Sequence, residues 1–275
     1  MDVNVIYNSE CRLGLKCLPE NSVNCCITSP PYYGLRDYGN DEQIGLEATP
    51  EEYIGKLVEV FREVRRVLTN DGTLWVNIGD SYAGSMKGAA QFPDNAMNYK
   101  QGTNRGALGK ATLVKQCTNC KPKDLIGIPW MLAFALRADG WYLRQDIIWS
   151  KPNPMPESVR DRCTKSHEYI FLLSKSRLYY FDADAIKVPA RESTMRRIRQ
   201  DVDNQVGSSR TLKANGNMKA VIGGRKRNFS DMTEDDPMYR ASTNREYEYT
   251  DKANKRSVWV VSTSAFHGAH FAVFP

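Results

Sequence analysis

The residues best suited to chemistry are Thr28-Ser29-Pro30-Pro31-Tyr32-Tyr33, which directly follow the apolar run Val23–Ile27. Small and β-branched residues in such a run are typical of a buried strand. Neither proline has an N–H group to donate within a sheet, so the strand must end at this point. Ligands of open α/β sheets bind at the carboxyl ends of strands. The sequence therefore predicts an active site at this turn.

The side chains and carbonyls of this turn suit a planar aromatic amine. The Ser29 hydroxyl and the Pro30 carbonyl offer neighbouring hydrogen-bond acceptors, and Tyr32 offers a flat apolar ring. Acceptors placed around the N–H bonds of such an amine localise its lone pair for attack on an electrophile. A nucleobase would stack on the ring, as extruded bases do on aromatic side chains. The alternative is a turn that only closes a strand, with tyrosines that only pack.

The tetrapeptide Ser29-Pro30-Pro31-Tyr32 resembles the catalytic signature Asp/Asn/Ser-Pro-Pro-Tyr/Phe of the DNA amino-methyltransferases. The longer stretch from Thr28 to Tyr38 is similar to one bacterial and phage branch of that family. The resemblance implies transfer of a methyl group from S-adenosylmethionine to the exocyclic amine of a base flipped out of double-stranded DNA. Serine at the first position of the signature favours cytosine-N4 over adenine-N6. The tetrapeptide supplies the expected catalytic residues Ser29, Pro30, Pro31 and Tyr32.

The same resemblance implies further site residues. Those expected near the cofactor are Glu10, Thr28, His270 and Phe271, and those expected around the base are Tyr33, Asn153, Pro154 and Met155. Glu10 stands where the family usually has Gly-Asp. A glutamate in the first turn of a helix, where the helix dipole favours it, is the alternative interpretation of this residue.

The elements that would position these residues follow from periodicity. Asn8-Ser9 suits a helix cap, and the apolar positions from Tyr53 to Leu68 recur at helical spacing. The predicted helices span 10–18, 50–68 and 126–139, and the predicted strands span 3–7, 23–27, 73–78, 141–149 and 166–173. Strand, helix and strand in this order form a crossover unit. The expected fold is α/β: a Rossmann-like S-adenosylmethionine-dependent methyltransferase sheet with helices on both faces, incomplete at the C-terminus.

Composition divides the chain into three expected regions. Residues 1–182 form a catalytic α/β region, with a flexible insert at about 81–116 that is rich in Gly, Asn and Lys. Residues 183–256 form a basic region for target recognition and DNA contact. Residues 257–275 resemble the start of the family's cofactor-binding half.

The basic region carries the main electrostatic signal for a polyanionic partner. The formal net charge is +6, and Lys187 to Arg227 is dense in Arg and Lys without apolar periodicity. Such a segment favours contact with a phosphate backbone, although a solvated linker shares its composition. The residues expected to bind DNA are Arg36, Arg196, Arg197, Arg199, Arg225, Lys226 and Arg227.

The cysteines and the apolar stretches indicate the cellular compartment and whether the protein binds a metal or a membrane. Seven cysteines, scattered through the chain, suggest reduced thiols in the cytoplasm. Cys117 and Cys120 form a Cys-x-x-Cys pair without a second pair at zinc-ribbon spacing, so we expect free thiols and no metal. The N-terminus lacks the regions of a signal peptide. The apolar stretch Ile126–Ala138 is shorter than the ~20 residues of a membrane span, so we expect no membrane partner.

The C-terminal segment from His270 to Pro275 is similar to the family's His-Phe-Ala-x-Phe-Pro. In the permuted family arrangement, a strand ending in Asp-Pro-Phe-x-Gly-Ser-Gly comes next, and this sequence contains no such glycine loop. We therefore expect a downstream segment or a second chain to supply the loop. The other hypothesis is a truncated, catalytically inactive DNA-binding remnant.

Overall fold

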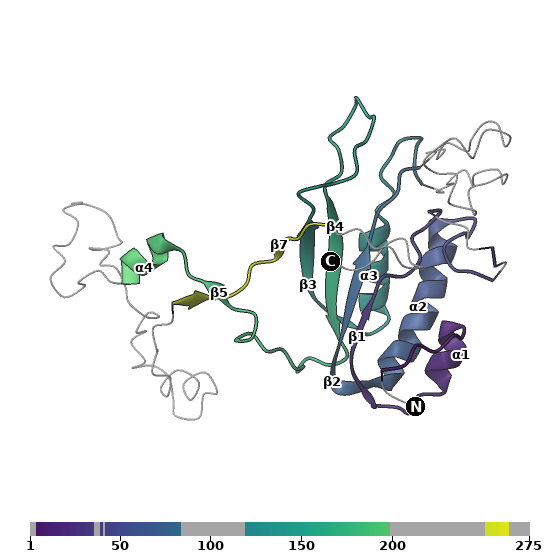
Figure 1. Cartoon of the computed structure of the whole chain (residues 1–275). Helices are drawn as coiled ribbons and strands as arrows, with labels where there is room; N and C mark the ends of the chain where they lie inside the picture. Colours follow the sequence, from purple (N-terminus) through teal and green to yellow (C-terminus); the bar gives the residue numbers. More distant parts are fainter. Residues whose placement is uncertain (1–3, 36–38, 41, 84–118, 199–250, 264–275) are drawn as a thin grey trace, which may run out of the picture. The chain divides into compact units, whose positions relative to one another are not determined.

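The computed structural model describes residues 4–35, 39–40, 42–83, 119–198 and 251–263. The chain divides into two compact units: Met1–Phe181 with Arg256–Pro275, and Asp182–Lys255. The first unit is built on a five-stranded sheet with the strand order β1-β2-β4-β3-β7 (Figure 1). It also contains the turn at Ser29, so it holds the predicted active site.

A parallel crossover unit carries that turn. Strand β1 (Val23–Thr28) pairs in parallel with β2 (Leu68–Ile78), and helix α2 (Pro50–Val67) connects them. The helix begins where the Thr49 side chain accepts the Glu52 N–H at 3.2 Å and a proline occupies the first turn. Its predicted apolar face, which includes Tyr53, is buried in the core. The predicted crossover is therefore confirmed.

The rest of the sheet is antiparallel around β4. Strand β4 (His167–Ser174) lies between β2 and β3 (Tyr142–Ser150) and runs antiparallel to both, whereas β3 and β7 (Val258–Val260) are parallel. Helix α3 (Ile128–Ala138) precedes β3. The sheet is therefore mixed, and the α/β class is confirmed.

The helices of this unit form one layer. Helix α2 contacts both α1 (Cys11–Lys16) and α3, and the three lie on one side of the sheet (Figure 1). Their apolar side chains and those of β2 and β4 make one core cluster. The expectation of helices on both faces is thus met on one face only among the described residues.

Three predictions at the N-terminal side were wrong. Residues 4–8 form no strand, because Asn4 has a left-handed φ of 62° and Ile6 is 98% exposed. The cap of α1 is Glu10 rather than Asn8-Ser9. Strand β1 is not buried but lies at the sheet edge, where Ile27 is 66% exposed.

The described cysteines also differ from expectation at one position. Cys11, Cys17, Cys25, Cys26 and Cys163 are free thiols. Cys120 is disulfide-bonded, so the prediction of a free thiol there was wrong. Cys117 lies outside the described residues. Within the described ranges, no three His, Cys, Asp or Glu side chains gather as a metal site would require.

The second unit contains a short antiparallel pair and one helix. Strands β5 (Val188–Pro189) and β6 (Lys252–Ala253) pair, and α4 spans Glu192–Ile198. The predicted insert at 81–116 lies outside the described residues except at 81–83. Of the helices that the structure describes, none has the length and apolarity to cross a membrane.

Asp80 follows β2, and its carboxylate accepts hydrogen bonds from the start of α3. Substitution of Asp80 therefore tests how this contact contributes to the stability of the fold. Its Oδ1 accepts the N–H groups of Gly127 at 2.9 Å and Ile128 at 3.0 Å, where α3 has no cap of its own. Replacing Asp80 with Ala should lower the free energy of unfolding by about 1–2 kcal/mol, since a helix cap is lost. Urea denaturation measures this loss. The exposed Asp71 is the matched control, and an equal loss in D71A would contradict the role of Asp80.

Candidate functional site

The turn after β1 is held by hydrogen bonds to its backbone carbonyls. The Pro31 carbonyl accepts a hydrogen bond from the Tyr53 hydroxyl at 2.8 Å, so a side chain of α2 anchors the turn. The next two carbonyls are also occupied, that of Tyr32 by the Leu35 N–H at 3.1 Å and that of Tyr33 by the Ser81 hydroxyl at 3.3 Å. The backbone path of the turn is thereby fixed.

The first two residues of the turn, Ser29 and Pro30, have oxygen atoms that can still accept hydrogen bonds. No donor among the described residues bonds the Pro30 carbonyl, and Pro30 itself is buried. The Ser29 side chain is exposed and forms a hydrogen bond with the Tyr32 side chain, which leaves acceptor capacity on its oxygen. Both stand at the carboxyl end of β1, beside the carboxyl end of its parallel neighbour β2. This is the edge at which open α/β sheets bind ligands.

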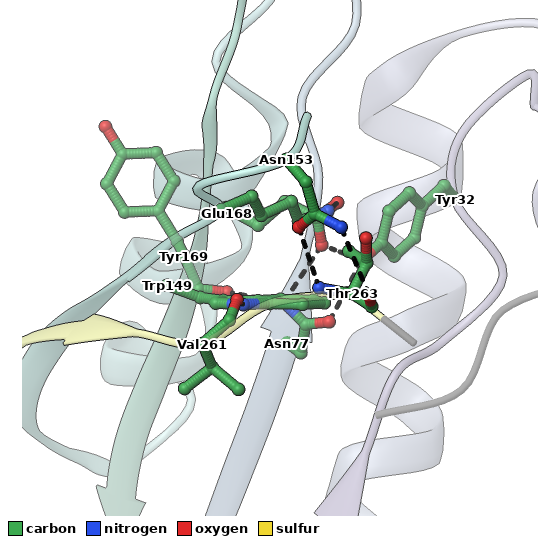
Figure 2. Close-up of polar contacts among 9 residues, drawn as sticks. Tyr32, Asn77, Trp149, Asn153, Glu168, Tyr169, Val261 and Thr263 are labelled. Carbon is green, nitrogen blue, oxygen red and sulfur yellow. Dashed lines mark hydrogen bonds and ion pairs between the residues drawn. The ribbon is translucent and has the colours of Figure 1, made fainter. Parts of the chain in front are cut away.

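The Tyr32 hydroxyl is tied to two strands of the sheet. It lies 2.7 Å from Glu168 Oε2 on β4 and 3.2 Å from Asn77 Oδ1 on β2 (Figure 2). A phenol has one proton to donate, and the shorter contact is to the charged acceptor. The Asn77 amide donates to the same Glu168 oxygen at 3.2 Å and to the Tyr169 carbonyl at 3.1 Å. Glu168 is therefore the acceptor that fixes Tyr32.

Lys151 balances the charge of this carboxylate. Its ammonium forms an ion pair with Glu168 Oε1, and the two side chains are only 17% and 18% exposed. The same ammonium lies 4.1 Å from the centre of the Trp149 ring, whose Nε1 donates to the Val261 carbonyl at 2.8 Å. A shielded ion pair with further hydrogen bonds is costly to break, since one partner would remain as an unpaired charge.

Glycine is required where β2 meets the Tyr32 ring. A Cβ at Gly79 would lie 2.6 Å from Cε2 and 2.9 Å from Cδ2 of Tyr32. The ring therefore rests directly against the backbone at the end of β2.

Burial shifts the pKa of two groups around this network. It raises the pKa of Tyr32 far above its ordinary value, and the neighbouring Glu168 raises it further, so the phenol remains a donor at neutral pH. Burial lowers the pKa of Lys165, against the opposing effect of nearby Asp80 and Glu168. Lys165 is a basic group of this site that the sequence did not indicate.

Several predicted site residues have other partners. Tyr33 is 3% exposed, packs on the Tyr53 ring and donates to the Ala48 carbonyl at 3.2 Å. It belongs to the core rather than to a base pocket, because the backbone turns its ring toward α2. Asn153 is exposed, and its side-chain amide exchanges hydrogen bonds with the backbone of Thr263 at 3.1 and 3.2 Å (Figure 2).

The remaining described residues that were predicted near the base or the cofactor differ in their surroundings. Pro154 is half-buried, Met155 is 84% exposed and Thr28 is the last residue of β1. Glu10 caps α1 by accepting the Leu13 N–H at 2.9 Å and pairs with Arg12. Burial opposes its ionisation, but hydrogen bonds from Arg12 and Leu13 lower the pKa of Glu10 to about 2. These contacts support the structural interpretation of this glutamate.

The predicted basic residues are described only in part. Arg196 is exposed on α4 and lies 3.7 Å from Glu192. The Arg197 side chain is not described. Outside the described residues lie Arg36, Arg199, Arg225, Lys226, Arg227, His270 and Phe271.

The sequence analysis missed Asn77, Lys151, Lys165 and Glu168. Two of them carried a signal: Asn77 interrupts the apolar run 74–78, and Glu168 directly precedes the apolar run 169–173. Buried polar side chains in strands require partners, so each position indicated an internal hydrogen bond. Neither position indicated which partner it had.

Buried phenols and a buried thiol predict the response of stability to high pH. Burial raises the pKa of Cys26 from 9.0 to about 11 and that of Tyr33 from 10.0 to about 12. Because the folded state retains these protons, its stability should be complete below about pH 9 and fall as the pH rises through 11 and 12. Urea midpoints at pH 8 and pH 10.5 measure the fall. It should be smaller in Tyr33→Phe, whereas the exposed control Tyr180→Phe should retain it; identical profiles for both would contradict this account.

Known proteins resemble this chain over most of its length. Residues 23–275 match the N6_N4_Mtase family, described as DNA methylase. The Type II methyltransferase M.Cfr9I of Citrobacter freundii is 43% identical over 274 residues, which cover 98% of this chain and 68% of that protein. The Type II methyltransferase M.SmaI of Serratia marcescens is 42% identical, with 98% and 70% covered.

Solved structures are more distant. A cytosine-N4-specific PvuII DNA methyltransferase is 16% identical, with a TM-score of 0.40, and the match covers 62% of this chain and 48% of that one. The family can be assigned from the sequence comparisons alone. Because residues 23–275 match the family and two relatives are more than 40% identical, the chain belongs to the N6/N4 family of DNA methylases.

Proposed function

We propose that this protein methylates the exocyclic amine of a base extruded from double-stranded DNA, at the turn formed by Ser29, Pro30, Pro31 and Tyr32. Membership of the DNA methylase family confirms the resemblance inferred from this tetrapeptide. The methyl donor of the family is S-adenosylmethionine, which supplies an electrophilic methyl group when bound. Its relatives are named Type II methyltransferases, which favours a role in a restriction-modification system.

The observation that carries the proposal is the set of available acceptors at the end of β1. The carbonyls of Pro31, Tyr32 and Tyr33 have donors, whereas that of Pro30 has none among the described residues. With the exposed Ser29 hydroxyl, it offers acceptors for the N–H bonds of an amine. Hydrogen bonds to those protons would localise the nitrogen lone pair for attack on the methyl carbon of the bound donor. The bond between that carbon and the donor sulfur would break as the new bond forms, the thioether would leave with the electron pair, and the amine would lose its extra proton to water.

Tyr32 supplies the surface on which the base stacks. Its hydroxyl is held by Glu168 and its ring edge by Gly79, so the ring has a fixed position beside Ser29. A base inside a duplex cannot reach this turn, which is why extrusion is part of the proposal. Serine at the first position of the tetrapeptide favours cytosine-N4 over adenine-N6.

Of the predicted cofactor contacts, only Thr28 and Glu10 lie within the described residues. Thr28 lies at the carboxyl end of β1, where a cofactor of an open α/β sheet would lie. The Glu10 carboxylate is engaged by Leu13 and Arg12, so a contact to the cofactor would compete with the cap of α1. Thr28 is therefore the described residue best placed to contact the cofactor.

DNA contact is assigned to the basic region of the second unit. Its described part carries the exposed Arg196 on α4, and the sequence continues with the arginines and lysines named above. Basic side chains of this kind neutralise phosphates without reading bases. Pro154 and Met155 remain proposed as parts of the base pocket, because Met155 is exposed on the loop that follows β3.

Methylome sequencing of DNA from cells that express the protein tests the function directly. We expect one sequence context to carry methyl groups on cytosine-N4, and expression with the sequence encoded downstream should be compared with expression of this chain alone. Methylation at adenine-N6 would change the target base and retain the enzyme class. DNA without any new methylation in both arms would contradict the proposal.

Removing the Tyr32 ring tests the stacking surface. Tyr32→Ala should lower the rate of methyl transfer roughly tenfold to one hundredfold, because base–aromatic stacking contributes ~1–3 kcal/mol. Transfer of a radiolabelled methyl group to DNA of the identified sequence measures this rate. The control is Tyr180→Ala, at a tyrosine that is 71% exposed. Equal rates for Y32A and the control would show that the Tyr32 ring only packs.

A further inference from the structure

The side chains linked to the Tyr32 hydroxyl come from distant parts of the chain. Asn77 lies on β2 and Glu168 on β4 (Figure 2). Lys151, which pairs with Glu168, directly follows β3. The register aligns them, since Trp149 is opposite Glu168 and Asn77 is opposite Ile170. The Glu168 carboxylate contacts all of them: it accepts hydrogen bonds from Tyr32 and Asn77 and pairs with Lys151.

We propose that Glu168 is a positioning residue, which fixes the plane of the Tyr32 ring so that the target base meets a rigid stacking surface. This inference rests on the proposed function, because it gives the network a role in methyl transfer rather than in folding alone. Lys151 and Asn77 support Glu168 in that role: the first balances its charge, and the second occupies the same oxygen as Tyr32.

The ring is held at both ends, which a packing role does not require. At the backbone end, Tyr53 bonds the preceding Pro31 carbonyl at 2.8 Å. At the far end, the hydroxyl donates to Glu168 at 2.7 Å, and the ring edge lies against Gly79. A tyrosine held only at its Cα can turn about its side-chain bonds, whereas a tie at the hydroxyl restricts that rotation. A ring that is already ordered loses less freedom when a base stacks on it.

The acceptor is a carboxylate in an ion pair. Lys151 pairs with Glu168, and Lys165 lies near enough to interact with it. Hydrogen bonds to an ionised acceptor are stronger than those to a neutral one. Glutamine in place of Glu168 would preserve the shape and lose the charge, so it should loosen Tyr32 and leave Lys151 unpaired.

The test is a double-mutant cycle on the full-length protein. The variants are Tyr32→Phe, Glu168→Gln and their combination, and the substrate is a duplex with the sequence found by methylome sequencing. Single-turnover rates of methyl transfer should fall roughly tenfold to one hundredfold in each single variant, as expected for loss of a hydrogen bond to a charged group. If Glu168 acts through the Tyr32 hydroxyl, the double variant should be no slower than the slower single variant. Duplex affinity, measured by fluorescence anisotropy, should be unchanged.

A second readout reports stacking without chemistry. With 2-aminopurine at the target position, stacking on Tyr32 should quench the fluorescence of the extruded base in the wild-type protein, and less so in Glu168→Gln. Glu157→Gln is the matched control, because Glu157 pairs with Arg162 and not with Tyr32. The Gly79→Ala substitution would displace the Tyr32 ring by steric contact, without changing any charge. If the Glu168→Gln protein does not fold, Gly79→Ala takes its place in the fluorescence measurement.

The outcomes separate this inference from the proposed function. Rates that fall independently in the two single variants and multiply in the double variant would overturn the positioning role. Variants that lose thermal stability but keep wild-type rates when folded would assign Glu168 to the fold alone. A wild-type protein that transfers no methyl group to any base would instead overturn the proposed function.

Discussion

Two consecutive prolines at the end of an edge strand are the constraint on which the rest of the structure depends. Pro30 and Pro31 have no N–H to donate, so β1 ends at Thr28 and the chain turns away from the sheet. The following carbonyls are then bonded by Tyr53, Leu35 and Ser81. The Ser29 hydroxyl, the Pro30 carbonyl and the Tyr32 ring then stand together at the end of the strand.

The sheet supports that turn through polar side chains as well as through packing. A carboxylate, an amide and an ammonium that are shielded from solvent would each be costly to bury alone. Here Glu168 satisfies Tyr32, Asn77 and Lys151 together, so the cost is offset by mutual contacts. The core cluster that includes Phe61, Leu74 and Phe171 is apolar, and its member Tyr53 reaches the turn through the hydrogen bond from its hydroxyl to the Pro31 carbonyl.

The failed predictions share a physical cause. Val5 and Ile6 have the composition of a strand, but the left-handed φ of 62° at Asn4 interrupts an extended path and Ile6 is 98% exposed, so composition alone did not decide the local structure. Tyr33 and Tyr32 are adjacent in sequence and equally aromatic. One is buried against Tyr53 and the other reaches Glu168, because successive side chains of an extended turn point in opposite directions.

Local sequence determined most of the elements of this protein. Helical spacing predicted α2 and α3 to within a few residues, β-branched and apolar runs predicted β1, β3 and β4, and the prolines predicted the end of β1. Only the tertiary structure decided that β4 lies between β2 and β3, and with it which side chains meet Tyr32. Tyr32 and Glu168 are 136 residues apart in the chain. No periodicity spans that separation, since the pairing of distant strands depends on the packing of the whole sheet.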